Sequence, residues 1–494
     1  MYTTELNLTN FKRFSSQPIN MSSKVTLLLG PNSSGKSSVI KALLGLKQTA
    51  SPSNENEVFS AQGEYVDLGV YKDYVTDHDI KKKIKIALKL RESLDPFGRR
   101  AEQDLQIEFC FGHDFATEQA RLLEIFVRDQ TKGGLTLISL TKKQTRDSFL
   151  LTISDSLGNQ LLSEIFGNKD SPQRAPLLAV WTNGVSVLAG DRYQFSLVAT
   201  KVKSEPNKDF FRNLPVSLLT RLVSSVLRGL DRDFFYTGPL RRSPSRSYGR
   251  TAHLLSVGPA GEHTPSVLAN LKSRAAKERS KERPQSKRLD QLNKWVEAIF
   301  PGCRIESKAV EELVKLEIVR ADGGREVISD VGFGISQVLP ILVQAAVMPA
   351  HTTLLIEQPE LHLHPSAQTK LAEVIADASN SGRRFLIETH SEHFVRGLQL
   401  AVSNGSAKKG LLANRLQPSD IAFIYVPRSP AAPHELSLDE WGEFSDLWPS
   451  GFFDEGYLAA MKLLQNKIVA QNRNTAASLA ADALERPKAR KSSV

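Results

Sequence analysis

Two patterns of apolar and polar positions divide this chain into parts. Apolar stretches that predict strands occur at 25–29, 313–319, 352–356 and 384–387, and the short run 25–29 is typical of a buried strand. Helix-like stretches accompany them at 38–44, 336–347 and 366–380. Strands that alternate with helices predict α/β architecture for residues 1–50 and 310–400.

A different pattern fills residues 80–205, where charged and apolar residues alternate with a period of two. The clearest examples are 83–90 and 106–111, and 135–140 and 149–153 continue the series. Strict alternation is typical of half-buried strands. We therefore expect an antiparallel sheet along one edge of the α/β domain.

Helical patterns return at 215–230 and 265–300, where Pro284 should break the helix. The second stretch is strongly basic, which suits either a solvated helix face or a surface that contacts nucleic-acid phosphates. Its cations are Lys272, Arg274, Lys277, Arg279, Lys281, Arg283, Lys287 and Arg288. One more strand is expected at 421–426, and a polar, basic tail from Asn472 should be disordered.

Composition is that of an ordinary globular protein. The 494 residues are 40% apolar and 24% charged, with a net charge of +10 that permits nucleic-acid contact without requiring it. Cys110 and Cys303 lie far apart, which argues against a disulfide framework or a zinc site. The chain shows no secretory signal, and its longest apolar stretch, 338–347, is too short to span a bilayer. We expect a cytoplasmic protein without a membrane partner.

The segment from residue 30 to residue 38, GPNSSGKSS, matches the phosphate-binding pattern G-x-x-x-x-G-K-[ST]. It lies between the apolar run 25–29 and a helix-like stretch, where such a loop must lie. Glycines let backbone amides surround phosphates, and the helix N-terminus adds its positive dipole end. The binding candidates are Gly30, Pro31, Asn32, Ser33, Ser34, Gly35, Lys36, Ser37 and Ser38.

Three later motifs complete a nucleotide site. Glu357 ends the run 352–356, where an acid holds the magnesium shell in phosphoryl-transfer proteins. His390 follows the run 384–387. Between them and the phosphate loop lies the signature turn, residues 329–337, which is rich in serine and glycine and opens a helix. Such a turn can present backbone amides to a second phosphate group.

In this order the motifs resemble the ABC-type ATPases of the SMC, RecF and OLD-like branch, and most closely the AAA-type ATPases of bacterial defence islands. The resemblance covers residues 1–90 and 310–400, with weaker likenesses at 10–14, 67–69, 236–241 (YTGPLR) and 448–455. It implies an α/β P-loop ATPase head, a mixed sheet flanked by helices. The head halves would be 1–90 and 306–400, with a β-rich, helical insertion at 91–305 and a small accessory region at 401–494.

The resemblance also implies a composite site, in which two ATP molecules lie between two heads. Lys36 would bind the β- and γ-phosphates, Ser37 and Glu357 would hold Mg²⁺, and His390 would sense the γ-phosphate. The signature turn of the other subunit would face them through Gly332, Gly334 and Ser336. Gln48 or Gln62 would couple magnesium to the adjacent lobe, although Gln48 also suits a surface position at a helix end. Lys12 or Arg13 would touch the nucleotide, or else lie in a surface turn.

One position departs from the family pattern. The acid that usually follows the magnesium ligand is replaced by Gln358, whose neutral amide orients water but accepts no proton. Glu360 is a candidate substitute. Hydrolysis is therefore expected to be slow, with a long-lived ATP-bound dimer; alternatively, related ATPases tolerate this sequence and hydrolyse ATP normally.

Other chemistry finds less support. His362 and His364 have a spacing that suggests a metal site, but no third or fourth ligand stands nearby, and a turn towards the dimer interface fits better. There is no His-Asn-His pattern and no strand-end Asp-x-Asp beyond His390, so we expect no nuclease centre in this chain.

Three functions remain for an ATPase of this kind. The first is a nucleotide-driven dimeric switch in anti-phage defence, with a separate nuclease or toxin as effector. The second is a RecF-like ATPase that binds DNA in repair or recombination, for which the basic segments 241–250 and 272–288 would face DNA. The third, the ATP subunit of a transporter, is disfavoured by the large β-rich insertion.

Overall fold

The computed structural model describes most of the first 446 residues. These are 2–50, 58–91, 104–131, 133–143, 148–157, 185–189, 195–197, 231–252, 254–278, 283–404, 416–428 and 432–446, with scattered positions in 159–161, 216–230 and 462–465. The chain separates into two units, Met1–Ser445 and Asp446–Val494. The first contains every element described below. The expected basic tail and the segment 448–455 lie outside the described residues.

A six-stranded sheet forms the centre of the α/β part. Its first five strands in spatial order are parallel, and β19 is antiparallel at the edge. The order is β11 (Phe234–Thr237), β16 (Thr353–Glu357), β17 (Arg384–Glu388), β3 (Val25–Leu29), β18 (Ile421–Tyr425) and β19 (His434–Leu436). Every residue of β3 and β16 is buried, which explains why both sequences are mostly apolar.

The second sheet has nine strands, and all its neighbours are antiparallel. Their order is β10 (Phe195–Leu197), β9 (Val185–Ala189), β8 (Ser148–Ile153), β7 (Leu135–Lys142), β6 (Ala120–Asp129), β5 (Leu105–His113), β4 (Ile84–Arg91), β1 (Tyr2–Thr9) and β2 (Gln17–Asn20). The antiparallel sheet expected from the alternating pattern is therefore present, and the N-terminal strands belong to it.

Helix α1 (Lys36–Thr49) joins the two sheets into one core. Its side chains share a buried cluster with strands of the nine-stranded sheet and with Leu355, Leu386 and Ile424 of the six-stranded sheet. Even its last turn is buried. The short helix α2 (Tyr71–Tyr74) adds two buried tyrosines to this cluster.

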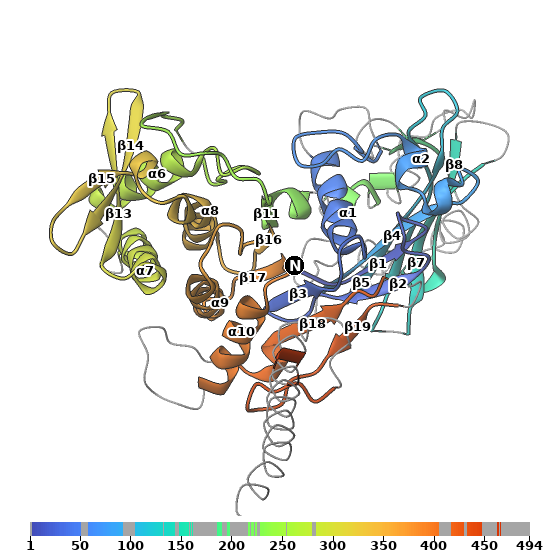
Figure 1. Ribbon diagram of the computed structural model, residues 1–494. Coiled ribbons are helices and arrows are strands. Elements are labelled where there is room, and N and C mark those ends of the chain that lie inside the picture. The colour runs from blue at the N-terminus through green and yellow to red at the C-terminus, as the bar shows by residue number, and fades with distance from the viewer. Residues whose placement is uncertain are drawn as a thin grey trace, which may run out of the picture. The chain divides into compact units, whose positions relative to one another are not determined.

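A second group of helices lies on the other side of the six-stranded sheet from α1 (Figure 1). They are α6 (Thr264–Ala276), α7 (Pro284–Ile299), α8 (Phe333–Val347), α9 (Pro365–Ser379) and α10 (Glu392–Asn404). Pro284 interrupts the basic helical stretch as expected, and it occupies the first turn of α7, where its missing N–H costs nothing. Asp377 of α9 accepts hydrogen bonds from Gln291 and Trp295 of α7, both at 2.7 Å.

A third, antiparallel sheet packs against α6 and α7. It consists of β12 (Tyr248–Gly249), β13 (Cys303–Val310), β14 (Leu313–Arg320) and β15 (Arg325–Val327). The run at 313–319 was expected to alternate with helices in the α/β sheet, and this expectation is wrong. Strand β14 pairs with β13 through a tight hairpin and buries only alternate residues.

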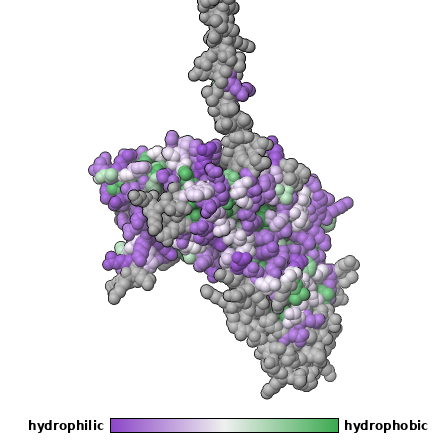
Figure 2. Space-filling model, turned by 90° about the horizontal axis from the view of Figure 1, so that it is seen from below, coloured by the Kyte–Doolittle hydropathy of each residue, from purple (hydrophilic) through white to green (hydrophobic). Residues whose placement is uncertain are grey.

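Three strands of the six-stranded sheet come from outside the segments assigned to the head by sequence. Strand β11 lies within the insertion 91–305, and β18 and β19 lie within the accessory region 401–494. The fold class is confirmed as an α/β head with a mixed sheet flanked by helices. On the face drawn in Figure 2 the described surface is mostly hydrophilic, with small, scattered apolar areas. No helix among the described residues is long and apolar enough to cross a membrane.

Candidate nucleotide-binding site

The phosphate loop connects β3 to α1, in the strand–loop–helix order that the sequence predicts. Two of its glycines have positive φ angles, 135° at Gly30 and 95° at Gly35. A Cβ atom at Gly30 would lie 2.2 Å from the carbonyl oxygen of Val426, and one at Gly35 would lie 2.4 Å from Cδ of Arg13. Both glycines are therefore required by backbone conformation and by space.

Lys36 opens α1 and folds back over the loop. Its Nζ donates to the carbonyl oxygens of Gly30 and Pro31, each at 2.9 Å. Burial lowers the pKa of this ammonium, and the charges of Glu388 and Glu360 oppose that effect. The positive charge is thus held at the mouth of the loop, where a phosphate would replace the two carbonyls. Ser34 is fully buried, and its hydroxyl has no hydrogen-bond partner in the described structure.

The two basic residues of the N-terminal turn have different positions. Arg13 packs against Gly35 and donates from Nη1 to the carbonyl oxygens of Ser34 and Pro427. Lys12 points to the carbonyl oxygen of Asp73 at 3.1 Å. Arg13 therefore braces the phosphate loop, and contact of either residue with a nucleotide stays a prediction.

Two carboxylates lie side by side at the carboxyl edge of the sheet. Glu357 ends β16, Glu388 ends β17, and the two are paired in register. Oε1 of Glu388 accepts a hydrogen bond of 3.0 Å from Oγ of Ser37, whereas Oε1 of Glu357 accepts one of 2.9 Å from the hydroxyl of Tyr236. Burial raises the pKa of both carboxyls, and the charge of Glu388 raises that of Glu357 further.

The residues that follow these strands are also connected. Glu360 accepts hydrogen bonds from Oγ1 of Thr389 at 2.9 Å and from the backbone N–H of His390 at 2.8 Å. Both of its oxygens thus hold the segment that carries His390. Burial lowers the pKa of His390, and the nearby charge of Lys36 lowers it further. The structure therefore brings His390 close to Lys36, as the predicted site requires.

Three contributors were missed by sequence reasoning. Glu388 was not singled out, although it stands directly before Thr-His at a strand end. Tyr236 and Arg241 were quoted only as part of YTGPLR. Nη2 of Arg241 donates to the carbonyl oxygens of Glu357 at 3.0 Å and Gln358 at 3.4 Å. Burial lowers the pKa of Arg241 to about 10. The motif thus fastens the turn after β16 from a neighbouring strand.

The two glutamine candidates differ in exposure. Gln48 is 1% exposed, and its amide bonds to backbone atoms of Ser60, Tyr65 and Val66. The expectation of a surface position for Gln48 is wrong, because the residue organises the loop after α1. Gln62 lies exposed in that same loop. A role for Gln62 in coupling to magnesium stays a prediction.

The signature turn lies at the start of α8, with Gly332 directly before the helix. Oγ of Ser336 donates to the carbonyl oxygen of Phe333 at 2.7 Å. A Cβ atom at Gly334 would lie 3.0 Å from the carbonyl oxygen of His362, and the ring of Phe333 packs edge-on against His362. The signature turn therefore contacts the loop after β16, and Phe333 remains 45% exposed there.

The paired histidines have structural contacts. His364 caps α9 by accepting from the backbone N–H of Ser366, and His362 contacts Phe333. Among the described residues, no group of three or more His, Cys, Asp or Glu side chains could hold a metal ion. Magnesium bound with a nucleotide needs fewer protein ligands, since phosphates and waters complete its shell.

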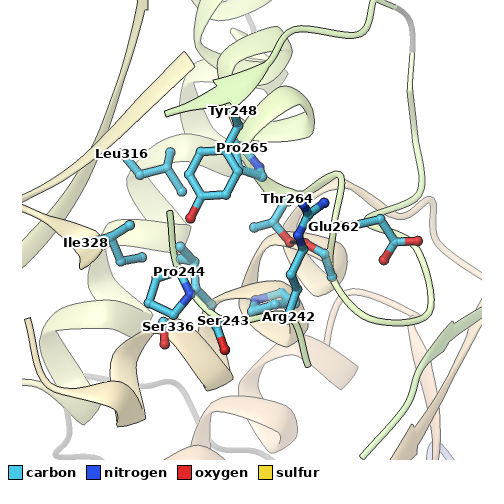
Figure 3. Close-up of a pocket in the computed structure, with 13 residues that line it drawn as sticks. Arg242, Ser243, Pro244, Tyr248, Glu262, Thr264, Pro265, Leu316, Ile328 and Ser336 are labelled. Carbon is cyan, nitrogen blue, oxygen red and sulfur yellow. Dashed lines mark hydrogen bonds between the residues drawn. The ribbon is translucent and has the colours of Figure 1, made fainter. Parts of the chain in front are cut away.

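A small pocket lies behind the signature turn (Figure 3). Arg242, Tyr248, Glu262 and Ser336 are among its lining residues, and its volume is about 30 Å³. None of its lining residues belongs to the phosphate loop, so the candidate site remains the sheet edge at that loop.

The basic segments serve partly in the fold. Nζ of Lys272 donates to the carbonyl oxygen of Ser307 at 3.0 Å, and Nη1 of Arg288 donates to that of Val347 at 3.2 Å. Arg246 pairs with Asp330. Several other cations of these segments are exposed, namely Arg242, Arg250, Arg274, Lys277, Arg283 and Lys287.

The residues at the sheet edge fit a magnesium–nucleotide group. The ammonium of Lys36 lies at the glycine loop, and the hydroxyl of Ser37 meets a carboxylate. Oε2 of Glu388 is buried without a hydrogen-bond partner among the described residues. Ser37, Glu357 and Glu388 are the side chains that would hold the metal. Fold and site together define a P-loop ATPase head.

Comparisons with known proteins agree with this class. A family model described as "AAA ATPase domain" matches residues 1–178, and one described as "AAA domain, putative AbiEii toxin, Type IV TA system" matches residues 195–396. The chain is 42% identical over 74 residues to the DNA replication and repair protein RecF of Roseiflexus castenholzii. That stretch is 14% of this chain and 18% of RecF, so the chain spans less than a fifth of this curated relative.

Solved structures with partial likeness are heads of SMC proteins. The SmcHead bound to the C-winged helix domain of ScpA is 11% identical with a TM-score of 0.42, over 89% of this chain and 98% of that one. The SMC head domain from Thermotoga maritima is 10% identical with a TM-score of 0.32, over 89% and 100%. These likenesses are distant, and the fold is established by the strand order of the protein itself.

Proposed function

We propose that this protein is a nucleotide-driven switch that binds ATP with Mg²⁺, pairs two heads around it and hydrolyses it slowly. One observation carries the proposal. Lys36, Ser37, the carboxylates of Glu357 and Glu388, and the segment of His390 meet at one edge of a parallel sheet. This is the position at which open α/β sheets bind nucleotides.

Each of these residues has a role that follows from its position. Lys36 would leave the loop carbonyls to contact the β- and γ-phosphates, and His390 would sense the γ-phosphate. Magnesium, when bound, neutralises the charge that develops on the transferred phosphate. Gln358 has a positive φ of 46°. Because its side-chain amide is neutral, it would orient water without accepting its proton. Slow hydrolysis would then prolong the ATP-bound state.

The proposed pairing of heads uses the signature turn. Exposed Phe333 and the start of α8 form a surface on which backbone amides of Gly332 and Gly334 could meet the nucleotide of a second copy. The dimer would thus have two shared sites, and its formation would depend on ATP. A larger assembly of such dimers is also compatible with the signature-turn surface.

For the biological setting we propose anti-phage defence in the cytoplasm, with a nuclease or toxin as a separate effector. The family description that names a putative toxin of a type IV toxin–antitoxin system supports this setting. A second candidate, a RecF-like ATPase that binds DNA in repair, is supported by the 74-residue match to RecF and by the exposed cations near α6 and α7. The neighbouring genes distinguish the two.

The first experiment measures the mass of the purified protein in solution with ATP and Mg²⁺, with and without duplex DNA. Lys36→Ala removes the phosphate-binding charge, and Lys81→Ala removes an exposed charge outside the site as a matched control. We expect an ATP-dependent dimer for the wild type and for Lys81→Ala, and a monomer for Lys36→Ala. If all three proteins have the same mass and the same nucleotide affinity, the assignment of the phosphate loop is wrong.

DNA separates the two settings. A RecF-like protein should bind duplex DNA more tightly with ATP, and its affinity should fall steeply with salt as counterions are released. A defence switch should instead protect cells that carry the native locus from phage, and Lys36→Ala should abolish the protection. Salt-dependent DNA binding without any protection would favour the repair function.

A further inference from the structure

The strand order of the central sheet places a second acid nearer the phosphate loop than the acid expected from sequence. Strand β17 lies between β16 and β3, and Glu388 is paired in register with Leu28 on one side and Glu357 on the other. Glu388 is therefore one strand, about 4.8 Å, closer to β3 and its phosphate loop. The order of the strands along the chain does not reveal this proximity, because β17 follows β16 in sequence but lies between β16 and β3 in the sheet.

The contacts of Glu388 and Glu357 differ accordingly. Glu388 is 4% exposed and accepts from Oγ of Ser37, the hydroxyl that ligates magnesium in phosphate loops. Its second oxygen is buried and has no donor among the described residues. Glu357 is instead held by the hydroxyl of Tyr236, one strand farther away. The carboxylate in contact with the metal-binding hydroxyl is thus that of Glu388.

Among the described residues near Glu357, Glu360 and Gln358 do not offer this combination. Glu360 uses both oxygens on the segment of His390. Gln358 carries no charge, and its backbone N–H donates to the carbonyl oxygen of Glu388 at 2.8 Å. The positive charges of Lys36 and Lys41 both act to lower the pKa of Glu388. A buried carboxylate with a free oxygen, facing cations and a ligand hydroxyl, is suited to a divalent cation.

We propose that Glu388 is a carboxylate of the magnesium shell beside Ser37, so that the acidic pair of this ATPase is divided between two strands. This inference rests on the proposed function, since it concerns the metal of the same ATP site.

The test measures how the affinity of the full-length protein for a fluorescent ATP analogue depends on Mg²⁺. Glu388→Gln keeps the shape of the side chain and removes its charge. We expect it to raise the Mg²⁺ concentration required for tight binding by at least about tenfold and to leave binding without Mg²⁺ unchanged. Glu312→Gln, at an exposed turn of the third sheet, removes the same charge as a control and should match the wild type.

Further variants separate the possible failures. Glu388→Asp keeps the charge on a shorter side chain and should lose less Mg²⁺ affinity than Glu388→Gln. If Glu388→Gln does not fold, Glu388→Asp is tested in its place. A wild-type Mg²⁺ dependence for Glu388→Gln, together with a loss for Glu357→Gln, would place the metal on β16 alone and overturn the inference. Lys36→Ala separates a failure of this inference from a failure of the proposed function. If Lys36→Ala binds the nucleotide as the wild type does, the phosphate loop is not the nucleotide site, and the proposed function fails.

Discussion

Replacing Tyr236 by phenylalanine removes the single hydroxyl that orients Glu357. Both side chains are 8% exposed, and the bond between them measures 2.9 Å. Tyr236→Phe therefore leaves an oriented carboxylate without its donor, and because this hydrogen bond lowers the pKa of Glu357, the variant also makes the carboxyl easier to protonate.

The size of the effect follows from the type of bond. A hydrogen bond to a charged group contributes about 1.5 to 3 kcal/mol, and the buried position favours the upper half of that range. Each 1.4 kcal/mol or so corresponds to a factor of about ten in an equilibrium constant. If Glu357 holds the metal in its charged, oriented form, Tyr236→Phe should weaken apparent Mg²⁺ affinity by roughly 10- to 100-fold.

The assay is a Mg²⁺ titration of fluorescent ATP-analogue binding, with thermal unfolding measured in parallel. Tyr71→Phe is the matched control, because Tyr71 is also a buried tyrosine, yet its hydroxyl donates to the carbonyl oxygens of Lys82 and Phe111 beneath the nine-stranded sheet. We expect both variants to lose stability and only Tyr236→Phe to lose Mg²⁺ affinity. Equal Mg²⁺ dependence in the two variants would refute the argument that Tyr236 sets the state of Glu357.

Three further predictions test the loop, the acids and the helix packing. Gly30→Ala should abolish nucleotide binding in the same fluorescence assay, because φ is 135° and the new Cβ would lie 2.2 Å from the carbonyl oxygen of Val426. Lowering the pH should weaken Mg²⁺ binding, because burial raises the pKa values of Glu357, Glu360 and Glu388 above 4.5 and protons compete with the metal. Over the same range, from pH 4.5 upward, the metal-free protein should lose stability as the pH rises, because its folded state retains protons that the unfolded state has released. Gly397→Ala should lower the free energy of unfolding by roughly 1–3 kcal/mol in denaturant titrations, since its Cβ would lie 2.5 Å from the carbonyl oxygen of Thr369 where α10 crosses α9.

Each of these has a result that would contradict it. Gly249→Ala, where a Cβ meets nothing within 4 Å, is the control for Gly30→Ala, and equal nucleotide affinity in the two variants would show that the loop tolerates a side chain. If the metal-free stability in thermal melts rises with pH together with the Mg²⁺ affinity, the acids are not held protonated by burial. An unchanged unfolding midpoint for Gly397→Ala would show that α9 and α10 separate without cost.

Much of the secondary structure could be predicted from sequence because burial imposes simple patterns. The run 25–29 is β3 without a residue of difference, and the alternating segment 83–90 is β4 to within one residue at each end. Burial on both faces favours apolar residues throughout a strand, and burial on one face favours them at every second position. The pattern failed at 313–319, because local sequence does not state which sheet a strand joins.

The sequence alone determined the chemistry that lies within one local segment. Glycines at 30 and 35, Lys36 and Ser37 specify a phosphate loop by themselves, since the loop, its strand and its helix are contiguous. The tertiary structure decided the rest, because Ser37 and Glu388 are 351 residues apart and meet only through the crossover that inserts β17 between β16 and β3. Neighbours in a parallel sheet are chosen by packing of the whole core, so the carboxylate that contacts Ser37 could be recognised only in the folded protein.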